Sequence, residues 1–446
     1  MGRPPFNHTP ALSEIARSAQ PLPFVAQEEY DALLASIGSA RVVLIGEASH
    51  GTHDFYRERA RITQRLIEEK QFGAVAIEGD WPDAFRIHRY VTGHNGPDAD
   101  ENANDALAGF RRFPGWMWRN MDVLAFVEWL RDFNRRRNSA VGFVGLDLYS
   151  LYKSAQQVLR YLDEHDPEAA QRARYRYSCF DQFGEDSQAY GYAAGFGLAE
   201  SCERAVVDQL MEMNRQRTID RPSGSALDTQ FSAKENAYLV RDAEQYYRTM
   251  FGGRVSSWNL RDRHMAETLD RVMADLGPES KVVVWAHNSH LGDARATQMD
   301  EQGELNLGQL VRERFRDAVF SVGFTTYSGE VTAASNWDEP AQRKIVRRAV
   351  PNSFEALFHE TGLGDFLLLL RDDAVRAALS KPMLERAIGV IYRPETERVS
   401  HYFHARLPEQ FDAVIHIDRS RALIPLDASV SWHQNEEVPE TYPSAV

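Results

Sequence analysis

Short apolar runs that stop abruptly at ionisable residues constrain this chain more than any other feature. Three such runs are each followed by glutamate or histidine: 42–46 by Glu47 and His50, 74–77 by Glu78, and 282–286 by His287 and His290. Uninterrupted apolar stretches of this length are typical of strands buried on both faces of a parallel sheet. Ligands bind at the carboxyl ends of such strands. The sequence therefore predicts one site assembled from three distant segments.

Around these runs the sequence alternates between segments with the apolar periodicity of helices and short apolar segments typical of strands. Helices are expected at 54–70, after Pro82 and at 121–137, between strands at 41–46, 74–78 and 141–146. Later strands are expected at 281–286, 318–325, 365–370, 387–392 and 412–418, with a hairpin turn at 327–330. This order predicts an α/β fold whose central sheet is mixed but largely parallel and has helices on both faces.

The chain divides into four stretches by pattern. Almost no strand signal occurs between 151 and 276, which indicates a helical lobe inserted into the sheet. The expected organisation is 1–40 as lead-in helices, 41–150 as the first part of the α/β core, 151–278 as the helical lobe over the site, and 279–446 as the second part of the core.

Charge and composition exclude some classes of binding partner and indicate a cellular location. The net charge of −14 argues against nucleic acid or an anionic membrane. No apolar run approaches the roughly 18 residues of a membrane span, and no signal peptide is recognisable. The two cysteines, Cys179 and Cys202, are too few for a disulfide framework. We therefore expect reduced cysteines and a cytoplasmic location.

The strand-end residues suit proton transfer. His50 lies between Gly46 and Gly51 in a strand-to-helix turn, where histidine can act as a general base, with Glu47 or Glu78 orienting its ring. His50 could instead cap the next helix. His287 and His290 fit a ligand pair or an oxyanion stabiliser, although either alone is more often a buried, hydrogen-bonded residue. Asp80 and Asp147 also end strands, and Asp147 could be a helix cap.

Other signals are weaker or absent. The chain has no G-x-S-x-G elbow, no H-E-x-x-H helix and no P-loop, which favours activated water over an acyl-enzyme. The tyrosine-rich stretch that includes Tyr177, Phe180 and Tyr190 is typical of core packing but also suits a cleft wall. Arg57 and Arg261 are the arginines that we expect in the site, although most arginines around them fit a solvated helix face.

These residues lie in segments that resemble the erythromycin esterase family. The longest matching segments are LIGEASHGTHDFY (44–56), AIEGDWPD (76–83), RFPGWMWRN (112–120), GLDLYSL (145–151), SWNLRDRHMAETL (257–269) and VVWAHNSHLGDA (283–294). The segment GVIYRPETERVSHYF (389–403) resembles one branch of the family, a branch that includes homologues without established macrolide activity. The resemblance covers essentially the whole chain.

The resemblance implies an activity and a set of site residues. Members that confer resistance hydrolyse the macrolide lactone, with the histidine of the E-x-x-H-G motif as the base on water. That histidine corresponds to His50, its glutamate to Glu47, the second-strand glutamate to Glu78 and the later histidine to His287. Arg57 and Arg261 correspond to arginines of the adjoining segments.

The expected function is hydrolysis of a small-molecule ester or lactone without a cofactor. His290, Asp80, Tyr177, Phe180 and Tyr190 are the expected substrate contacts. One alternative is a metal-dependent hydrolase whose ligands are His50, His287 and His290 with Glu47 or Glu78. The other is a protein that binds a small molecule without changing it. The sequence determines neither the substrate nor the oligomeric state.

Overall fold

The fold is taken from a computed structural model that describes residues 9–23, 28–94, 96–138, 140–215, 227–428 and 432. A nine-stranded sheet runs through it in the order β1-β8-β11-β6-β2-β5-β3-β4, with β7 paired to β6. The strands are β1 Gln20–Pro21, β2 Val42–Ile45, β3 Ala74–Asp80, β4 Gly142–Asp147, β5 Val282–Trp285, β6 Val319–Ala333, β7 Gln342–Val346, β8 Phe366–Leu369 and β11 Ala413–Ser420. β9 (Met383–Arg386) and β10 (Tyr402–Ala405) form a separate antiparallel pair.

The direction of the strands agrees with the predicted fold class. Six neighbouring strands, from β11 through β6, β2, β5 and β3 to β4, are parallel. β8, β1 and β7 are antiparallel to their neighbours. The predicted mixed, largely parallel sheet is confirmed, and its parallel part carries the three strands that end in glutamate and histidine.

Helices cover both faces because alternate strand residues point to opposite sides. Val43 and Ile45 belong to a core with α2 (Asp31–Ile37), α3 (His53–Lys70), α4 (Trp81–Val91) and α6 (Met121–Arg137). Val42 and Leu44 belong to a second core on the opposite face, formed with α12 (Arg254–Leu276) and α15 (Leu307–Phe315). β2 therefore contributes to two cores, which explains its unbroken apolar sequence.

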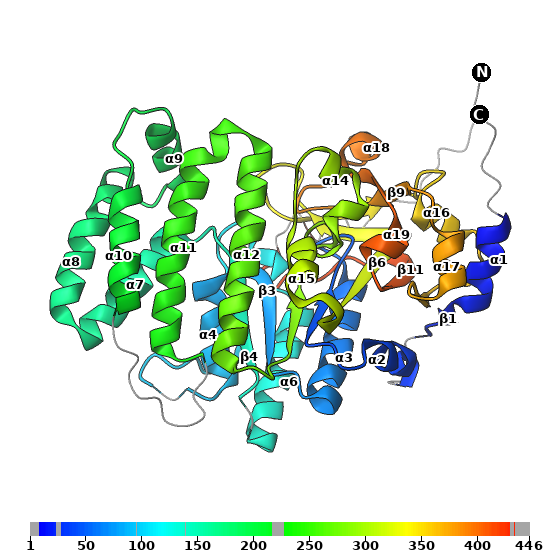
Figure 1. The fold of residues 1–446 in the computed structure, drawn as a ribbon, viewed down its shortest axis with the longest axis horizontal. Coiled ribbons are helices and arrows are strands. Elements are labelled where there is room, and N and C mark those ends of the chain that lie inside the picture. Colours follow the sequence, from blue (N-terminus) through cyan, green and yellow to red (C-terminus); the bar gives the residue numbers. More distant parts are fainter. Residues whose placement is uncertain are drawn as a thin grey trace, which may run out of the picture.

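The region between β4 and β5 is helical, as its sequence pattern indicates. Its helices are α7 (Leu151–His165), α8 (Pro167–Tyr177), η3 (Ser178–Phe183), α9 (Ser187–Gly195), α10 (Glu203–Arg215), α11 (Thr229–Thr249), η4 (Met250–Gly252) and α12. The helices α7 to α11 stand together at one end of the molecule, and α12 lies between them and the sheet (Figure 1). The remaining helices are α1 Thr9–Ser18, η1 Glu28–Tyr30, α5 Ala103–Leu107, η2 Gly115–Met117, α13 Asn288–Leu291, η5 Ala294–Ala296, α14 Gln298–Glu301, η6 Arg316–Ala318, α16 Phe354–His359, α17 Asp373–Ala378, η7 Pro394–Thr396, α18 Glu397–Ser400 and α19 Leu407–Gln410.

Two local expectations are wrong. β6 continues through 327–330, where a hairpin turn was expected, because Ser328 and Gly329 pair with the end of β11. The strand expected at 387–392 is instead β9, which ends at Arg386. Residues 387–392 form isolated bridges to Ser49 and Ala334, so this apolar stretch lies beside the first strand-end loop rather than inside a sheet.

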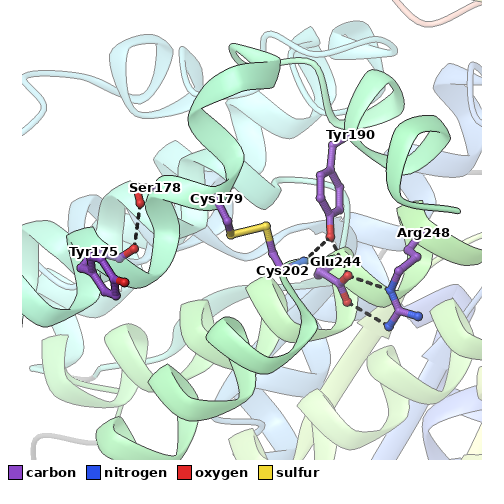
Figure 2. The surroundings of a disulfide bond; sticks show 7 residues. All are labelled: Tyr175, Ser178, Cys179, Tyr190, Cys202, Glu244 and Arg248. Carbon is purple, nitrogen blue, oxygen red and sulfur yellow. Dashed lines mark hydrogen bonds and ion pairs between the residues drawn. A yellow bond between two sulfur atoms is a disulfide. The ribbon is translucent and has the colours of Figure 1, made fainter. Parts of the chain in front are cut away.

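The expectation of two reduced cysteines is also wrong. Cys179 of η3 and Cys202, just before α10, form a disulfide (Figure 2). The sequence separation of 23 residues gave no indication of this contact, because η3, α9 and α10 must fold back on one another to bring the two residues together.

Among the described residues no helix is long and apolar enough to cross a membrane.

The loop after β2 allows no side chain at Gly51. A Cβ atom at this position would overlap the carbonyl group of Thr332, whose backbone N–H donates to the Gly51 carbonyl. We predict that Gly51→Ala lowers the free energy of unfolding by ~1–3 kcal/mol, the range typical of overpacking. Urea unfolding measures this, with Gly252→Ala as the control because no atom lies within 4 Å of a Cβ there. Equal stability of the two variants would contradict the prediction.

Candidate active site

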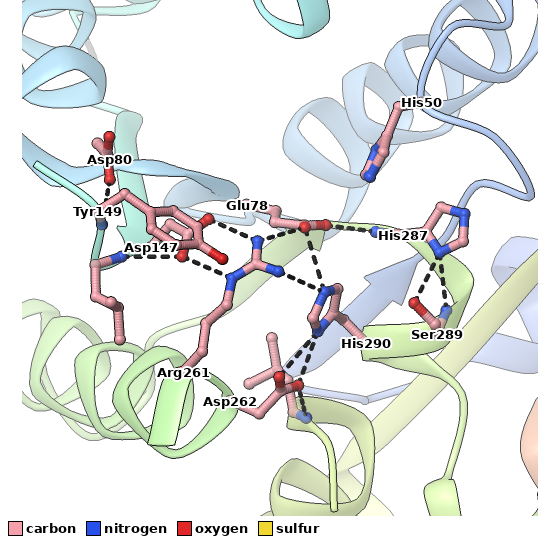
Figure 3. Close-up of polar contacts among 12 residues, drawn as sticks. His50, Glu78, Asp80, Asp147, Tyr149, Arg261, Asp262, His287, Ser289 and His290 are labelled. Atoms are coloured by element: carbon pink, nitrogen blue, oxygen red, sulfur yellow. Dashed lines mark hydrogen bonds and ion pairs between the residues drawn. The ribbon is translucent and has the colours of Figure 1, made fainter. Parts of the chain in front are cut away.

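The site lies at the carboxyl ends of four neighbouring strands, β2, β5, β3 and β4. Glu47 and His50 follow β2, His287 follows β5, Glu78 lies near the end of β3, and Asp147 ends β4. A cavity of about 590 Å³ opens above them, and all of these residues except Glu47 line it. The strand order therefore brings together the residues predicted from the sequence, as Figure 3 shows for the polar contacts around Glu78.

His50 is held by the glutamate three residues before it. The Nδ1 atom of His50 lies 2.9 Å from Oε1 of Glu47, which is completely buried. A carboxylate on Nδ1 accepts its proton, so the Nε2 atom carries the lone pair of the neutral ring. The ring points towards Glu78 and His287 (Figure 3). Glu47 and His50 thus have the arrangement of a base and the group that orients it.

Glu78 is a buried anion surrounded by donors. Its carboxylate accepts hydrogen bonds from Nη2 of Arg261 (2.7 Å) and from the backbone N–H of His287 (2.8 Å). Nε2 of His290 lies 3.3 Å from the same carboxylate. Burial opposes ionisation, but the charges of His290 and Arg261 hold the pKa of Glu78 well below its ordinary value. Glu78 is therefore an anion over the whole physiological pH range.

His287 and His290 occupy contrasting environments. Burial, and then the neighbouring His50, lower the pKa of His287 to about 3, so its ring is neutral. Its Nδ1 atom accepts a hydrogen bond from the backbone N–H of Ser289, and its ring centroid lies 4.8 Å from that of His50. Burial also disfavours a charge on His290, but Asp262 and Glu78 raise the pKa of His290 above its ordinary value. Trp258 stacks on the His290 ring.

Arg261 joins the end of β4 to the other strand ends. Its guanidinium donates two hydrogen bonds to Asp147, at 2.9 and 2.7 Å, as well as the bond to Glu78. Nη1 lies 3.0 Å from Nε2 of His290. The hydrogen bonds to the two carboxylates use three of its five N–H groups. Asp147 is thus an ion-pair partner of Arg261 rather than a helix cap, although its Oδ1 also accepts from the N–H of Leu148.

Asp80 lines the same cavity. It accepts a hydrogen bond from the backbone N–H of Tyr149, and Nη2 of Arg112 lies 3.4 Å from its other oxygen. Asp83, one turn further along α4, forms an ion pair with Lys153, and burial raises the pKa of Asp83 to about 6. Asp80, Asp83 and Arg112 make part of the cavity wall polar. Phe110, Trp118, Tyr149, Trp258 and Tyr402 supply apolar surface.

Three predicted substrate contacts lie elsewhere. Tyr177, Phe180 and Tyr190 are buried within the helical lobe and do not line the cavity. Tyr190 donates a hydrogen bond to Glu244 inside the lobe (Figure 2). The prediction that these residues form the cleft wall is wrong, because the stretch packs against α11 instead of facing the strand ends.

The prediction that Arg57 of α3 lies in the site is also wrong. It forms ion pairs with Asp54 and Glu58 and does not line the cavity. Arg59 is fully buried, and its Nη2 atom lies 3.4 Å from Oε2 of Glu47. The helical periodicity of α3 could have identified Arg59 as buried, because it shares one stripe of the helix with Phe55, Ile62 and Leu66.

The site offers little to a metal ion. Among the described residues no group of three or more His, Cys, Asp or Glu side chains has an arrangement that could hold one. Four of the six imidazole nitrogens face other partners: Nδ1 of His50 faces Glu47, Nδ1 of His287 faces Ser289, and both nitrogens of His290 face carboxylates. The guanidinium of Arg261 lies between the carboxylates that a cation would need.

Known proteins similar to this chain indicate the family to which it belongs. The chain is 21% identical to the protein YbfO of Bacillus subtilis, over 91% of this chain and 90% of that protein. It is 22% identical to erythromycin esterase type II of Escherichia coli, over 69% and 74% of the two chains. The fold matches the solved structure of an erythromycin esterase mutant in its open conformation, with a TM-score of 0.65, 16% identity and coverage of 93% and 99%. Residues 67–420 match the erythromycin esterase family, to which this chain therefore belongs.

Proposed function

We propose that this chain hydrolyses an ester or lactone bond of a small organic molecule, with His50 as the base on water. The observation that carries the proposal is the contact between Glu47 and His50, because it leaves the Nε2 atom of a cavity-lining histidine as the proton acceptor. Family membership supports hydrolysis of the esterase type. The product of attack is a carboxylic acid and an alcohol, joined in one molecule if the substrate is a lactone.

Glu47 stabilises the charge that the base acquires. When His50 takes a proton from water, its imidazolium lies 2.9 Å from the buried carboxylate. The contact of Glu47 with Arg59 on its other oxygen keeps that carboxylate in place. His287 is neutral and packs against the His50 ring, so it positions the base without competing for the proton. We place it there rather than at the oxyanion because its Nε2 atom is buried.

Arg261 is the group that we propose for the oxyanion. It lines the cavity, carries a positive charge, and retains the two N–H groups of Nη1, which are bound by neither Asp147 nor Glu78. A fixed donor of this kind acts where negative charge develops, and loss of one such donor typically costs ~10²–10³-fold in rate. Asp147 and Glu78 fix the plane of the guanidinium, so it needs no rearrangement during the reaction.

The cavity supports a bulky substrate. Its volume of about 590 Å³ is within the range for drug-sized ligands. Aromatic walls and the polar side around Asp80 suit a molecule with an apolar body and several oxygen atoms. The relatives named erythromycin esterase make a macrolide lactone the first candidate, and with it a role in antibiotic resistance. A cytoplasmic location also stays a proposal, and the disulfide does not favour it.

We predict that His50→Gln loses roughly 10²–10⁴-fold in hydrolysis rate, because the substituted side chain cannot take the proton from water. Mass spectrometry of macrolides, other lactones and aryl esters incubated in ¹⁸O-labelled water would detect a product that has gained one labelled water. His53→Gln is the matched control, because His53 contacts Asp122 and does not line the cavity.

The possible outcomes of this experiment distinguish the proposed hydrolase from a binding protein. Normal turnover by a folded His50→Gln protein would rule out the proposed base. Saturable binding by the wild type without any product, unaffected by His50→Gln, would make the chain a binding protein.

A second prediction concerns His290. Asp262→Asn removes the carboxylate that raises the pKa of His290, so this pKa falls and the ring loses its charge at a lower pH. If the charge supports catalysis, activity is present below this pKa and is lost above it, so the alkaline limb of the rate profile shifts to lower pH. NMR titration of the ring and the pH profile measure the two effects. Asp242→Asn, which alters the comparable pair with His264 in the lobe, should leave the profile unchanged.

A third prediction addresses the metal-dependent alternative. Because Arg261 lies between the carboxylates, we expect activity to survive extended dialysis against a chelator and not to rise when Zn²⁺ or Mn²⁺ is added. Elemental analysis of the same samples measures bound metal. Stoichiometric metal that is removed together with the activity, and restores it when added back, would overturn the assignment of Arg261.

A further inference from the structure

Asn288, the residue after His287, is completely buried and does not line the cavity. Its side chain contacts β6 with both polar atoms: Nδ2 donates a 2.7 Å hydrogen bond to the carbonyl of Phe324, and Oδ1 accepts from the backbone N–H of the same residue at 3.3 Å. β2 pairs with β6 only as far as Val322, so these two bonds continue the pairing after β2 has ended. The Asn288 amide therefore takes the place of further strand backbone and lets the chain turn away into the catalytic loop.

The backbone of Asn288 also holds the loop that carries His50. Its N–H donates a 2.9 Å hydrogen bond to the carbonyl of Glu47. Gly46 leaves the space that the amide needs, since a Cβ atom there would overlap the Oδ1 atom of Asn288. A shift of Asn288 would therefore move Glu47, and with it the ring of His50, whose Nδ1 atom contacts the Glu47 carboxylate.

The second N–H of the Asn288 amide faces Glu385 of β9. Nδ2 of Asn288 lies 3.3 Å from Oε1 of Glu385, and the Glu385 side chain is completely buried. Its other oxygen, Oε2, has no hydrogen-bond partner among the residues that the structure describes. An ionised carboxylate at this position would lack the donors that a buried charge requires.

A second buried carboxyl group, that of Glu355 in α16, is next to Glu385. Its Oε1 accepts a 2.7 Å hydrogen bond from the backbone N–H of Arg386, whereas its Oε2 is unpartnered within the described part of the chain. Burial, and then the charge of Glu355, raise the pKa of Glu385 to about 8, although contacts with Gln410 and Asn288 oppose this rise. Burial also raises the pKa of Glu355, against the charge of Arg386. Neighbouring buried carboxyl groups of this kind do not both ionise.

We propose that Glu385 and Glu355 share one proton, carried by Glu385, and that neutral Glu385 is a positioning residue for the base on water. The proton accounts for both unpartnered oxygens, since Oε2 of Glu385 becomes a donor and Oε2 of Glu355 an acceptor. Glu355 is the anionic member, because it receives the backbone N–H and the favourable charge of Arg386. Neutral Glu385 then holds the Asn288 amide without placing a negative charge behind the catalytic loop. The positioning role rests on the proposed function, whereas the shared proton does not.

The pH dependence of unfolding tests the shared proton. Folded Glu385 keeps its proton up to about pH 8, but the unfolded side chain releases it at about pH 4, so rising pH favours unfolding between these values. From pH 5 to 7 the unfolding constant of the wild type should therefore rise about tenfold more per pH unit than that of Glu385→Gln, which has no such proton. Glu360→Gln, at an exposed glutamate just after α16, is the control and should keep the wild-type slope. Equal slopes for the wild type and Glu385→Gln would overturn the shared proton.

Hydrolysis of any ester or lactone that the wild type cleaves tests the positioning role. Glu385→Met keeps the length of the side chain but removes the acceptor for Asn288, so kcat should fall roughly tenfold while KM stays nearly unchanged, since Glu385 does not line the cavity. Glu385→Gln retains a neutral acceptor and should restore the wild-type kcat. Glu385→Ala is the second variant if Glu385→Met does not fold. An equal loss of kcat in the Gln and Met variants, or a loss confined to KM, would contradict the positioning role.

NMR spectra of the His50 ring give the same comparison without a substrate. The ring resonances should shift in Glu385→Met and stay in place in Glu385→Gln. If the wild type cleaves no ester or lactone, the proposed function fails, but the unfolding slopes and the ring resonances still decide the proposal for Glu385. Unshifted His50 resonances in a folded Glu385→Met protein would overturn the positioning role.

Discussion

The buried negative charge of Glu78 is the constraint on which the site depends. An ionised carboxylate without water is costly unless several donors surround it. Arg261 of α12, the backbone N–H of His287 after β5, and the ring of His290 supply those donors. Because each comes from a different part of the chain, satisfying one carboxylate fixes the relative positions of β3, β5 and the helical lobe. Removing one partner of such a buried pair typically costs ~3–5 kcal/mol.

The negative charge of Glu78 also determines how the neighbouring charged side chains are arranged. Arg261 needs Asp147 as a second carboxylate to hold its guanidinium flat, and His290 needs Asp262 on its far side. Positive and negative groups thus alternate from β4 to β5. His287 stands at the end of this row, without a carboxylate of its own, and is neutral. His50 is separate, because its carboxylate is Glu47. The base and the charged cluster are therefore two units that meet at the ring contact between His50 and His287.

Glu47 depends in turn on Arg59, a charge enclosed by aromatic rings. The guanidinium carbon of Arg59 lies 4.4 Å from the centroid of Tyr56 and 4.9 Å from that of Trp285. Such rings stabilise a cation where water is excluded. The ion pair with Glu47 and this aromatic enclosure connect α3 to the loop that carries His50. The catalytic loop is thus supported by its own following helix and by the strand that ends at His287.

Residues placed by strand order were predictable from the sequence, whereas those placed by rotation about a helix were not. Glu47, Glu78 and His287 were predictable because parallel strands must end at one edge, whichever way their side chains pack. Arg57 and Arg59 lie two positions apart, about 200° around α3, and only the stripe of buried residues distinguishes them. The prediction for the tyrosine-rich stretch of the lobe failed for another reason: aromatic clustering indicates that residues are buried together, but not on which side of a lobe. The disulfide was not predictable for a similar reason, because it depends on how the helices of the lobe pack against one another.

The division between floor and wall explains why family membership constrains the reaction more than the substrate. Strand ends form the floor, and their side chains have few alternatives that keep Glu78 satisfied. The walls come from segments outside the sheet, 110–118 on one side and 387–403 on the other. The second wall is nonetheless attached to the base, since the backbone N–H of His50 donates to the carbonyl of Ile388, and the N–H of Ile388 donates to that of Ala48. A change in the 387–403 wall that alters substrate choice must therefore keep this pair of bonds, or it moves His50 as well.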